Sequence, residues 1–315
     1  MLLRGLRWGL AGVLVAWTVI RLLGLDRGWP PVPLVAFTPI VAALALLGAL
    51  VAVLLRQRLF ALVAGTCAAV LAIGMAPRVI PNRAPADAPG VRLRVLAANV
   101  AANPAAAADV VALARRLRVD VLSVVELPPA LALAYDAAGI GDLLPQRSLR
   151  PRPGFAGTGL YARVPLQATP GPLDTRFAIS AAAVVAPGAA PVAVFAVHVP
   201  APTGPDDARQ WRRDMRALPA TGPTGQLRVL AGDFNATLDH GELRRLLGRG
   251  YRDAAEQAGS GLRPTWPTAR SLLPAVVTID HVLADRRVRV DSARSVAIPG
   301  SDHRGVLAEL VVPRG

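Results

Sequence analysis

Three long apolar stretches open the chain, and they restrict its fold more than any other feature. Residues 8–25 are apolar except for Arg21, residues 32–55 carry no charge over 24 positions, and residues 59–77 carry none over 19. A helix needs about 20 residues to cross a bilayer. We therefore predict an all-α transmembrane region of three helices in residues 1–80, which makes the chain a multi-pass protein of the cell membrane.

The first apolar stretch taken alone resembles a signal peptide, because Arg4 and Arg7 precede it. Two further apolar stretches follow, however, and no small-residue cleavage site is evident. We therefore interpret the first stretch as part of a membrane anchor.

Arginines at the ends of these stretches predict the orientation of the anchor. Two precede the first stretch and two separate the second from the third: Arg4, Arg7, Arg56 and Arg58. Because positive charge favours the cytoplasmic side, we expect the N-terminus in the cytoplasm. Three crossings then place everything after residue 80 outside it. Arg21, near the end of the first stretch, is expected to snorkel toward the membrane surface.

A linker is predicted at residues 81–90, PNRAPADAPG, because Pro, Ala and Gly dominate them. The remaining residues, 91–315, are enough for one well-buried domain. The only cysteine, Cys67, lies in the third apolar stretch. No disulfide within one chain can therefore stabilise this domain.

Positive charge is spread over both parts of the chain. The net charge of +14 divides into +6 for residues 1–90 (8 Arg, 2 Asp) and +8 for residues 91–315 (27 Arg, 19 Asp plus Glu). Every basic residue is arginine, which a GC-rich genome alone explains, so we do not take it as a sign of nucleic-acid binding. The charge does fit an anionic substrate or an acidic lipid surface.

Residues 91–315 alternate between strand-like and helix-like patterns, which predicts an α/β fold. We predict helices at residues 104–118, 205–218 and 239–248, the last beginning with a capping box of Asp239 and Glu242. The predicted strands are residues 92–99, 119–126, 158–163, 176–186, 191–198, 226–233, 276–284, 288–298 and 305–312.

Polar residues gather where these strands end or in the loops just beyond. They are Asn99, Glu126, His198, Asp233, Asn235, Asp280, Asp302 and His303. Ligands bind at strand ends in layered α/β folds. Since carboxylates and amides are hard oxygen ligands, the set favours Mg²⁺, with Mn²⁺ or Ca²⁺ as alternatives, over zinc.

The order of these motifs resembles the endonuclease/exonuclease/phosphatase superfamily, whose members include deoxyribonuclease I and neutral sphingomyelinases. The motifs are Asn99, Glu126, His198, GDFN at 232–235, Ile279-Asp280-His281 and Ser301-Asp302-His303. The resemblance implies a DNase I-like four-layer α/β sandwich of two mixed β-sheets flanked by helices. Three apolar stretches before such a domain also resemble the actinobacterial VanJ-type membrane proteins of this superfamily.

The resemblance implies a metal site. Glu126 matches the metal-ligand glutamate, and Asn99 and Asp302 lie where the superfamily completes the metal and phosphate site. Relatives often have Gln before the glutamate, whereas this chain has Val125, which leaves the residues around the ligand less polar.

The resemblance also implies catalytic roles. Asp233 matches the aspartate that orients or deprotonates the attacking water, and Asn235 the amide that binds a phosphate oxygen. His303 matches the essential histidine, paired with Asp280, and His198 lies where relatives contact the phosphate or leaving group. The reaction implied is in-line attack of water on phosphorus.

The combined prediction is a membrane-anchored, divalent-metal-dependent phosphohydrolase, either phosphodiesterase or phosphatase. Tethering favours a phosphorylated lipid or lipid pyrophosphate outside the cytoplasm, and no obligate protein partner is evident. Two alternatives stay open: an endonuclease or exonuclease acting on nucleic acid, and a non-catalytic membrane-bound sensor or scaffold. Serine hydrolases, NTPases and zinc enzymes are disfavoured, because the chain has no GxSxG, Walker, CxxC or HExxH motif.

Three conspicuous residues receive structural interpretations. We expect His281 to pack in the core, His240 to be structural beside a helix start, and Trp266 to be a half-buried aromatic.

Overall fold

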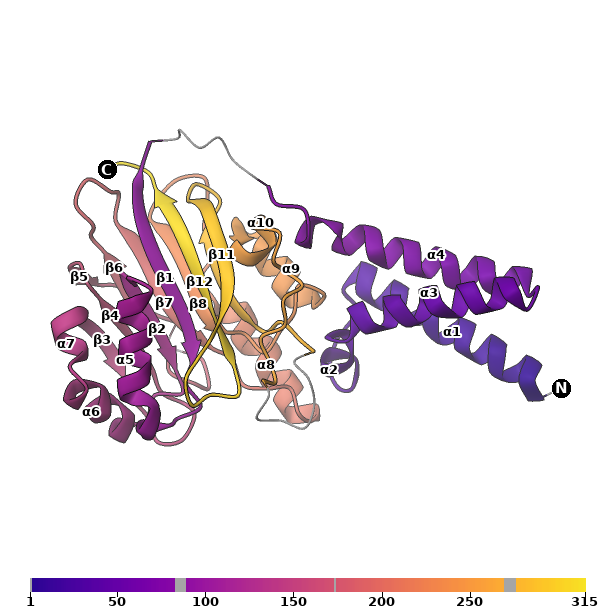
Figure 1. Ribbon diagram of the computed structural model, residues 1–315, viewed down its shortest axis with the longest axis horizontal. Helices are drawn as coiled ribbons and strands as arrows, with labels where there is room; N and C mark the ends of the chain where they lie inside the picture. The colour runs from indigo at the N-terminus through magenta and orange to yellow at the C-terminus, as the bar shows by residue number, and fades with distance from the viewer. Residues whose placement is uncertain (1, 83–88, 173, 269–275) are drawn as a thin grey trace.

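The computed structural model describes residues 2–82, 89–172, 174–268 and 276–315. It has two parts, a group of N-terminal helices and an α/β unit that begins at Val91 (Figure 1). Most of the predicted linker, residues 83–88, lies outside the described residues.

The first and third apolar stretches each form one long helix, and the second forms two. The helices are α1 (Leu2–Leu23), α3 (Thr38–Leu54) and α4 (Arg58–Met75), with a short α2 (Pro31–Val35) between the first two and a 3-10 turn η1 (Ala76–Arg78) after the last. Two segments, Gly5–Leu23 and Arg58–Arg78, are long and apolar enough to cross a membrane. At 17 residues α3 is shorter, so crossing by three helices stays a prediction.

The predicted second span is divided because of Pro39. Proline lacks an N–H, and its ring clashes with the carbonyl four residues earlier in a continuous helix. Helix α2 therefore ends at Val35, and α3 begins at Thr38 with Pro39 in its first turn.

The α/β unit contains two mixed sheets of six strands. The first has the order β11-β12-β1-β2-β4-β3 and the second β5-β6-β7-β8-β10-β9. The pairs β1–β2 and β7–β8 are parallel, and the other neighbours are antiparallel. The strands are β1 (Val91–Asn99), β2 (Val121–Val125), β3 (Gln146–Arg150), β4 (Thr158–Ala162), β5 (Leu166–Ala168), β6 (Ser180–Val184), β7 (Val192–His198), β8 (Leu227–Asp233), β9 (Tyr251–Asp253), β10 (Asp280–Asp285), β11 (Arg289–Ala297) and β12 (Arg304–Val312).

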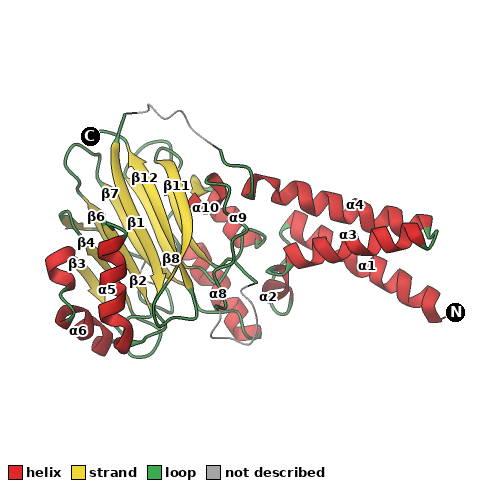
Figure 2. Cartoon of the chain, viewed as in Figure 1, coloured by secondary structure: helices red, strands yellow, loops and turns green. Residues whose placement is uncertain are grey.

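Helices cover the outer faces of both sheets, so the unit has four layers (Figure 2). Alternate residues of β1, such as Val95 and Ala97, pack against alternate residues of β8, such as Val229 and Ala231, in the core between the sheets. Helices η2 (Pro104–Ala106), α5 (Ala107–Arg116), α6 (Pro129–Ala137) and α7 (Ile140–Leu143) lie on the first sheet's side, and α8 (Pro205–Ala217) and α9 (Gly241–Gly248) cover the second sheet. Two mixed sheets flanked by helices are the arrangement that the sequence predicted.

All nine predicted strands and all three predicted helices of the α/β unit are present, with shifted ends. Six elements were not predicted: β3, β5, β9, α6, α7 and α10 (Ala254–Gln257). Strand β3 reads QRSLR and is partly exposed at a sheet edge, so it lacks the apolar alternation on which strand prediction depends.

The predicted capping box of α9 is wrong. Helix α9 begins at Gly241, and Asp239 makes no cap. Instead the carboxylate of Asp26, from the loop after α1, accepts hydrogen bonds from Gly241 N at 3.0 and 3.1 Å. A carboxylate more than 200 positions away in the sequence therefore accepts hydrogen bonds from the first backbone N–H of α9, which has no partner within the helix.

Asp239 forms a buried ion cluster with two arginines of the N-terminal helices. Arg21 Nε lies 2.9 Å from Asp239 Oδ1, and both terminal nitrogens of Arg78 lie 2.7 Å from the carboxylate. Burial alone would raise the pKa of Asp239, but the hydrogen bonds and charges of Arg78 and Arg21 hold it below its usual value. The expected snorkelling of Arg21 is therefore wrong, because its guanidinium points into the α/β unit.

The N-terminal helices also contribute to the core of the α/β unit. Val32 of α2 is completely buried and belongs to the core cluster that contains Phe195 and Trp211. Residues on both sides of the linker therefore form one packed body, in which the segment that joins α1 to α3 has a fixed place.

We predict that Asp239→Asn lowers the free energy of unfolding of the full chain by about 3–5 kcal/mol, because two buried guanidinium groups lose their counter-charge. The matched control is Asp136→Asn, since Asp136 pairs with Arg147 on the surface, where a pair contributes at most about 1 kcal/mol. Denaturant unfolding in detergent micelles measures both. Equal stability of the two variants would contradict the role given to the cluster.

Candidate active site

The predicted site residues meet at one edge of the sandwich because of the two parallel strand pairs. The C-terminal ends of β1 and β2 lie side by side in one sheet, and those of β7 and β8 in the other. The antiparallel strand β10 begins at the same edge, with Asp280 directly opposite Asp233.

The second sheet contributes a row of three side chains. His198, Asp233 and Asp280 are direct neighbours across β7, β8 and β10. They have the same parity as the residues that fill the core between the sheets, so they point toward the first sheet. Strand β8 can pass this close to β7 only because residue 232 is glycine: its φ is +147°, and a Cβ there would lie 2.0 Å from Val197 O.

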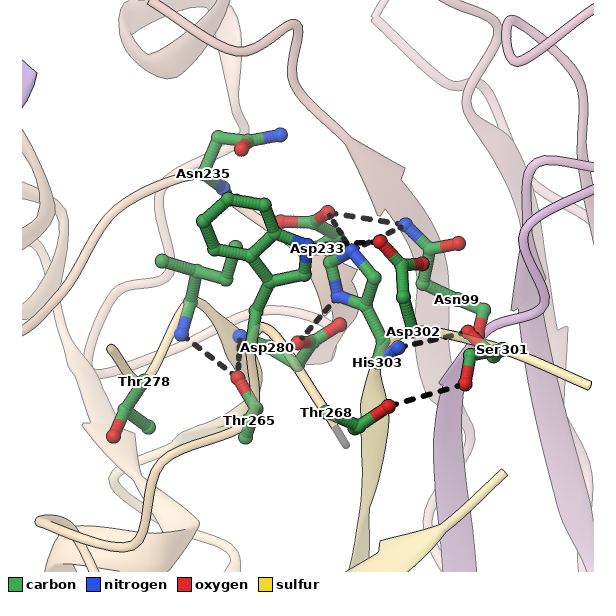
Figure 3. A network of polar contacts seen from close by, with 12 residues as sticks. Asn99, Asp233, Asn235, Thr265, Thr268, Thr278, Asp280, Ser301, Asp302 and His303 are labelled. Atoms are coloured by element: carbon green, nitrogen blue, oxygen red, sulfur yellow. Dashed lines mark hydrogen bonds and ion pairs between the residues drawn. The ribbon is translucent and has the colours of Figure 1, made fainter. Parts of the chain in front are cut away.

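The first sheet contributes Asn99, which connects the two sheets. Its Nδ2 donates to Asp233 Oδ2 at 3.1 Å (Figure 3). The same nitrogen donates to Glu126 Oε1 at 3.0 Å, while Oδ1 accepts from Ala101 N at 3.0 Å. Asn99 thus presents its amide nitrogen, not its oxygen, to the carboxylates. Its predicted role as a metal ligand requires the oxygen, and that role stays a prediction.

Glu126 reaches the site through an unusual backbone conformation. Strand alternation would send its side chain to the helix-covered face, because Val121 faces the inter-sheet core and Leu122 and Val124 face the helices. Glu126 has φ +62°, a left-handed conformation that costs of order 1 kcal/mol for a non-glycine residue. This turn redirects the carboxylate to Asn99.

His303 and Asp280 form a buried pair. His303 Nδ1 donates to Asp280 Oδ2 at 2.9 Å. Ser301 fixes the loop that carries His303, because its hydroxyl donates to Asn99 O at 2.8 Å and accepts from His303 N at 3.0 Å. The other oxygen of Asp280, Oδ1, is buried without a hydrogen-bond partner among the described residues.

The pKa values of the two site histidines are shifted in opposite directions. For His303, burial alone would lower the pKa, but the charge and hydrogen bond of Asp280, with Asp233, raise it to about 10, so the ring is protonated at neutral pH. For His198, burial lowers the pKa. Its Nδ1 donates to Phe155 O at 3.0 Å, which leaves Nε2 facing Glu126 and Asp233, 4.0 Å from each.

The carboxylates of the site suit a divalent cation. Burial, together with the charges of Asp233 and Asp302, raises the pKa of Glu126 to about 7, despite the hydrogen bond from Asn99. A cation relieves such repulsion between crowded carboxylates. Ligand atoms of Asp233, Asp280 and His303 lie within 4.8 Å of one another, which makes these three residues a candidate metal site. The predicted metal ligands Glu126 and Asp302 line the same pocket as Asp233, and metal binding by them stays a prediction.

The site opens into a pocket of about 600 Å³. Its polar lining includes Glu126, His198, Asp233, Asn235, Asp302 and His303. Asn235 has φ +46° and donates from Nδ2 to Val199 O at 2.9 Å. All the predicted site residues except Asn99 and Asp280 line the pocket, and these two lie directly behind it, bonded to Asp233 and His303.

The profile of the endonuclease/exonuclease/phosphatase family matches residues 95–303, which include every residue of the site. The chain belongs to the endonuclease/exonuclease/phosphatase family. Membership indicates a hydrolase of phosphoric ester bonds that depends on a divalent metal. No match is found among curated proteins.

Solved structures of low identity share the fold of this family member. A family protein from Beutenbergia cavernae has 20% identity and a TM-score of 0.53, covering 70% of this chain and 72% of its own. Humanized D. rerio TDP2 has 18% identity and a TM-score of 0.54, and the match covers 70% of this chain and 98% of that one. Truncated Caenorhabditis elegans TDP2 has 15% identity and a TM-score of 0.55, and its match covers the same shares of the two chains.

Some contacts of the site were not foreseen from the sequence. Thr265 Oγ1 accepts from Asp280 N at 3.2 Å, and Trp266 Nε1 donates to Asp302 Oδ2 at 3.1 Å. Trp266 was expected to be half-buried, but it is exposed, with 38% of its surface accessible, and it lines the pocket. His281 is buried as expected, but it bonds to Asp253 and to Ala236 O rather than packing only by contact. No sequence motif marks Thr265 and Trp266, which lie in a loop, or Asp253, which ends β9.

In the metal-free protein we predict that stability falls as the pH rises from about 6.5 to about 10. The folded state keeps the His303 proton that the unfolded state loses, so this stabilisation is complete below the unfolded pKa and lost as the pH passes the folded one. Thermal unfolding with a chelator measures the effect. Asp280→Asn should flatten the slope, and an unchanged slope would show that the pair does not hold the proton.

Proposed function

We propose that the protein is a membrane-anchored phosphodiesterase or phosphatase that uses Mg²⁺ and water to hydrolyse a lipid-linked phosphate ester or anhydride outside the cytoplasm. One observation carries the catalytic part: Asn99, Glu126, His198, Asp233, Asp280 and His303 converge from six chain segments on one pocket. A scaffold without activity has no need of such an arrangement.

The role of each residue follows from whether its side chain carries a proton. Asp233, held by Asn99 and by Asn235 N at 2.8 Å, orients the attacking water and accepts its proton. Protonated His303 lies 3.8 Å from Asp233 and stabilises negative charge on the phosphoryl oxygens. Asn235 contacts the phosphate from the second sheet through its amide, and His198 lines the pocket beside it, near the leaving group.

Glu126 and Asp302 would hold the cation, while Asn99 keeps Glu126 and the general base Asp233 in place. A divalent cation supplies charge neutralisation at phosphate oxygens and a fixed orientation of the substrate. Mg²⁺ is the proposal because the donors are hard oxygen atoms without a thiolate.

The surface of the N-terminal helices supports the membrane anchor. Large apolar side chains face outward along them, for example Leu54 with 81% and Ile73 with 73% of their surface exposed. A soluble surface rarely carries so continuous an apolar area. The three helices extend away from the sandwich, so a bilayer around them leaves the α/β unit in water (Figure 1).

The helix directions support an outward-facing site. Helix α1 runs toward the sandwich, α3 runs away from it, and α4 runs back toward it (Figure 1). The start of α1, with Arg7, and the turn between α3 and α4, with Arg56 and Arg58, are therefore at the same end of the helices, far from the active site. By the positive-inside rule this arginine-bearing end is cytoplasmic.

Nucleic acid is the second candidate substrate. D. rerio TDP2, which shares the fold, has been solved with a single-strand DNA product. Binding a nucleic-acid strand requires cations along its phosphates. Although the chain contains 35 basic residues, none of the described residues that line the pocket is an arginine. This favours one phosphate group attached to an apolar chain.

We predict that the full chain in detergent micelles with Mg²⁺ hydrolyses bis(p-nitrophenyl) phosphate, and that Asp233→Asn lowers kcat by about 10²- to 10⁴-fold because the general base is lost. A chelator should abolish the activity. Assays with polyprenyl pyrophosphate, phospholipid and duplex DNA then rank the substrate classes.

Asp206→Asn is the matched control for this assay, since Asp206 is 91% exposed on α8, and it should keep the wild-type rate. Wild-type activity in Asp233→Asn, or inactivity of every protein on every substrate, would refute the enzyme assignment.

We predict that an alkaline phosphatase reporter fused after residue 90 is active, because an odd number of crossings exports it. A reporter that works only in the cytoplasm would reverse the proposed orientation.

A further inference from the structure

The pocket has an apolar wall that comes from the N-terminal helices and not from the α/β unit. Trp29, Pro33, Ala36 and Phe37 line it together with the catalytic residues. These four residues belong to the segment 24–37, which joins α1 to α3. The family match begins only at residue 95, so this wall is a feature of this chain beyond the matched region.

The segment 24–37 is held rigidly at the pocket. Asp26 caps α9, Val32 and Val35 are buried, and the ion pair of Arg21 with Asp239 fixes the preceding end of α1. On this fixed support Trp29 keeps 52% and Phe37 keeps 38% of its surface exposed. Large exposed aromatics on a rigid segment beside a catalytic site indicate a binding surface for an apolar group.

Further apolar side chains are exposed next to this wall. Leu34 on α2 and Ile40 at the start of α3 are 45% and 41% exposed, and they follow Pro33 and Phe37, which line the pocket. An apolar chain that leaves the pocket beside Phe37 therefore finds further apolar contacts on the N-terminal helices.

From this geometry we propose that Trp29 and Phe37 are specificity-determining residues that bind the first carbons of the apolar chain of a lipid phosphate, with its phosphate at Asp233 and His303. The inference rests on the proposed hydrolase function and assigns its selectivity to the anchor. Apolar contact at these two side chains increases kcat/KM for long-chain substrates and leaves the chemistry on short-chain substrates unchanged.

Alkyl p-nitrophenyl phosphates with methyl to dodecyl chains test this proposal, because only the chain length varies. With the full chain in micelles and Mg²⁺, kcat/KM should rise with chain length. In Trp29→Ala and Phe37→Ala the dodecyl value should fall on the order of tenfold, the contribution of a buried aromatic contact, while the methyl value stays the same.

The control is Trp8→Ala, since Trp8 is a comparably exposed tryptophan on α1 at the end away from the pocket. It should keep the wild-type chain-length dependence. Trp29→Gln and Phe37→Gln remove the aromatic surface but leave a larger side chain than alanine does, so they should behave like the alanine variants. Thermal unfolding reports whether each variant is folded.

The outcomes separate the two levels of the proposal. Hydrolysis that depends on Asp233 but is the same for all chain lengths, or in which the Trp29 and Phe37 variants match Trp8→Ala, overturns the inference and leaves the proposed function standing. Absence of hydrolysis in every protein overturns both. Inhibition by a single-stranded oligonucleotide that disappears in Trp29→Ala would instead show that the aromatic wall stacks bases.

Discussion

Each sheet contains one pair of parallel strands, and the site is possible because the ends of these two pairs lie at the same edge of the sandwich. Because β1 runs with β2 and β7 with β8, four strand ends meet at one edge of the sandwich. Face-to-face packing then brings Asn99 of one sheet within hydrogen-bond distance of Asp233 of the other. A buried amide that satisfies two carboxylates at once makes their proximity tolerable, and a cation completes the compensation. The charged pair of His303 and Asp280 lies at the same edge, so the residues proposed as charge stabiliser, general base and metal ligands are close together.

The buried carboxylate of Asp239 fixes the position of the N-terminal helices beside this site. Asp239 pairs with Arg21 and Arg78, which lie at the ends of α1 and η1. Such a cluster needs all its members, because an unpaired charge in the interior is costly. Its consequence is positional: the segment between α1 and α3 is placed over the pocket, with Val32 in the core and the two aromatics Trp29 and Phe37 at the wall. In the proposal made here, membrane attachment and substrate selection are therefore two results of the same interface.

Much of this structure was predictable from local patterns. Strands and helices with regular apolar periodicity were found, and the motif residues were placed at strand ends, because alternation and caps are local properties. The errors occurred where a residue's partner is distant. Asp239 followed by Glu242 has the pattern of a capping box, but Asp239 binds arginines more than 150 positions away along the chain, and Asp26 makes the cap instead. Arg21 looked like a snorkelling residue because its partner was not visible in the sequence.

The sequence by itself determined the family, the strand-helix order, the chemical nature of the site and the apolar character of the first 80 residues, since motifs and periodicity are written in neighbouring positions. Folding was needed to show the pKa shifts of the two site histidines, the turn of Glu126 into the site, and the place of residues 24–37 in the pocket wall. These properties depend on burial and on charges brought together from distant segments, and on a left-handed backbone angle at Glu126 that its side chain does not favour. The physical reason is that burial, electrostatics and strain are set by neighbours in space, and no local pattern records them.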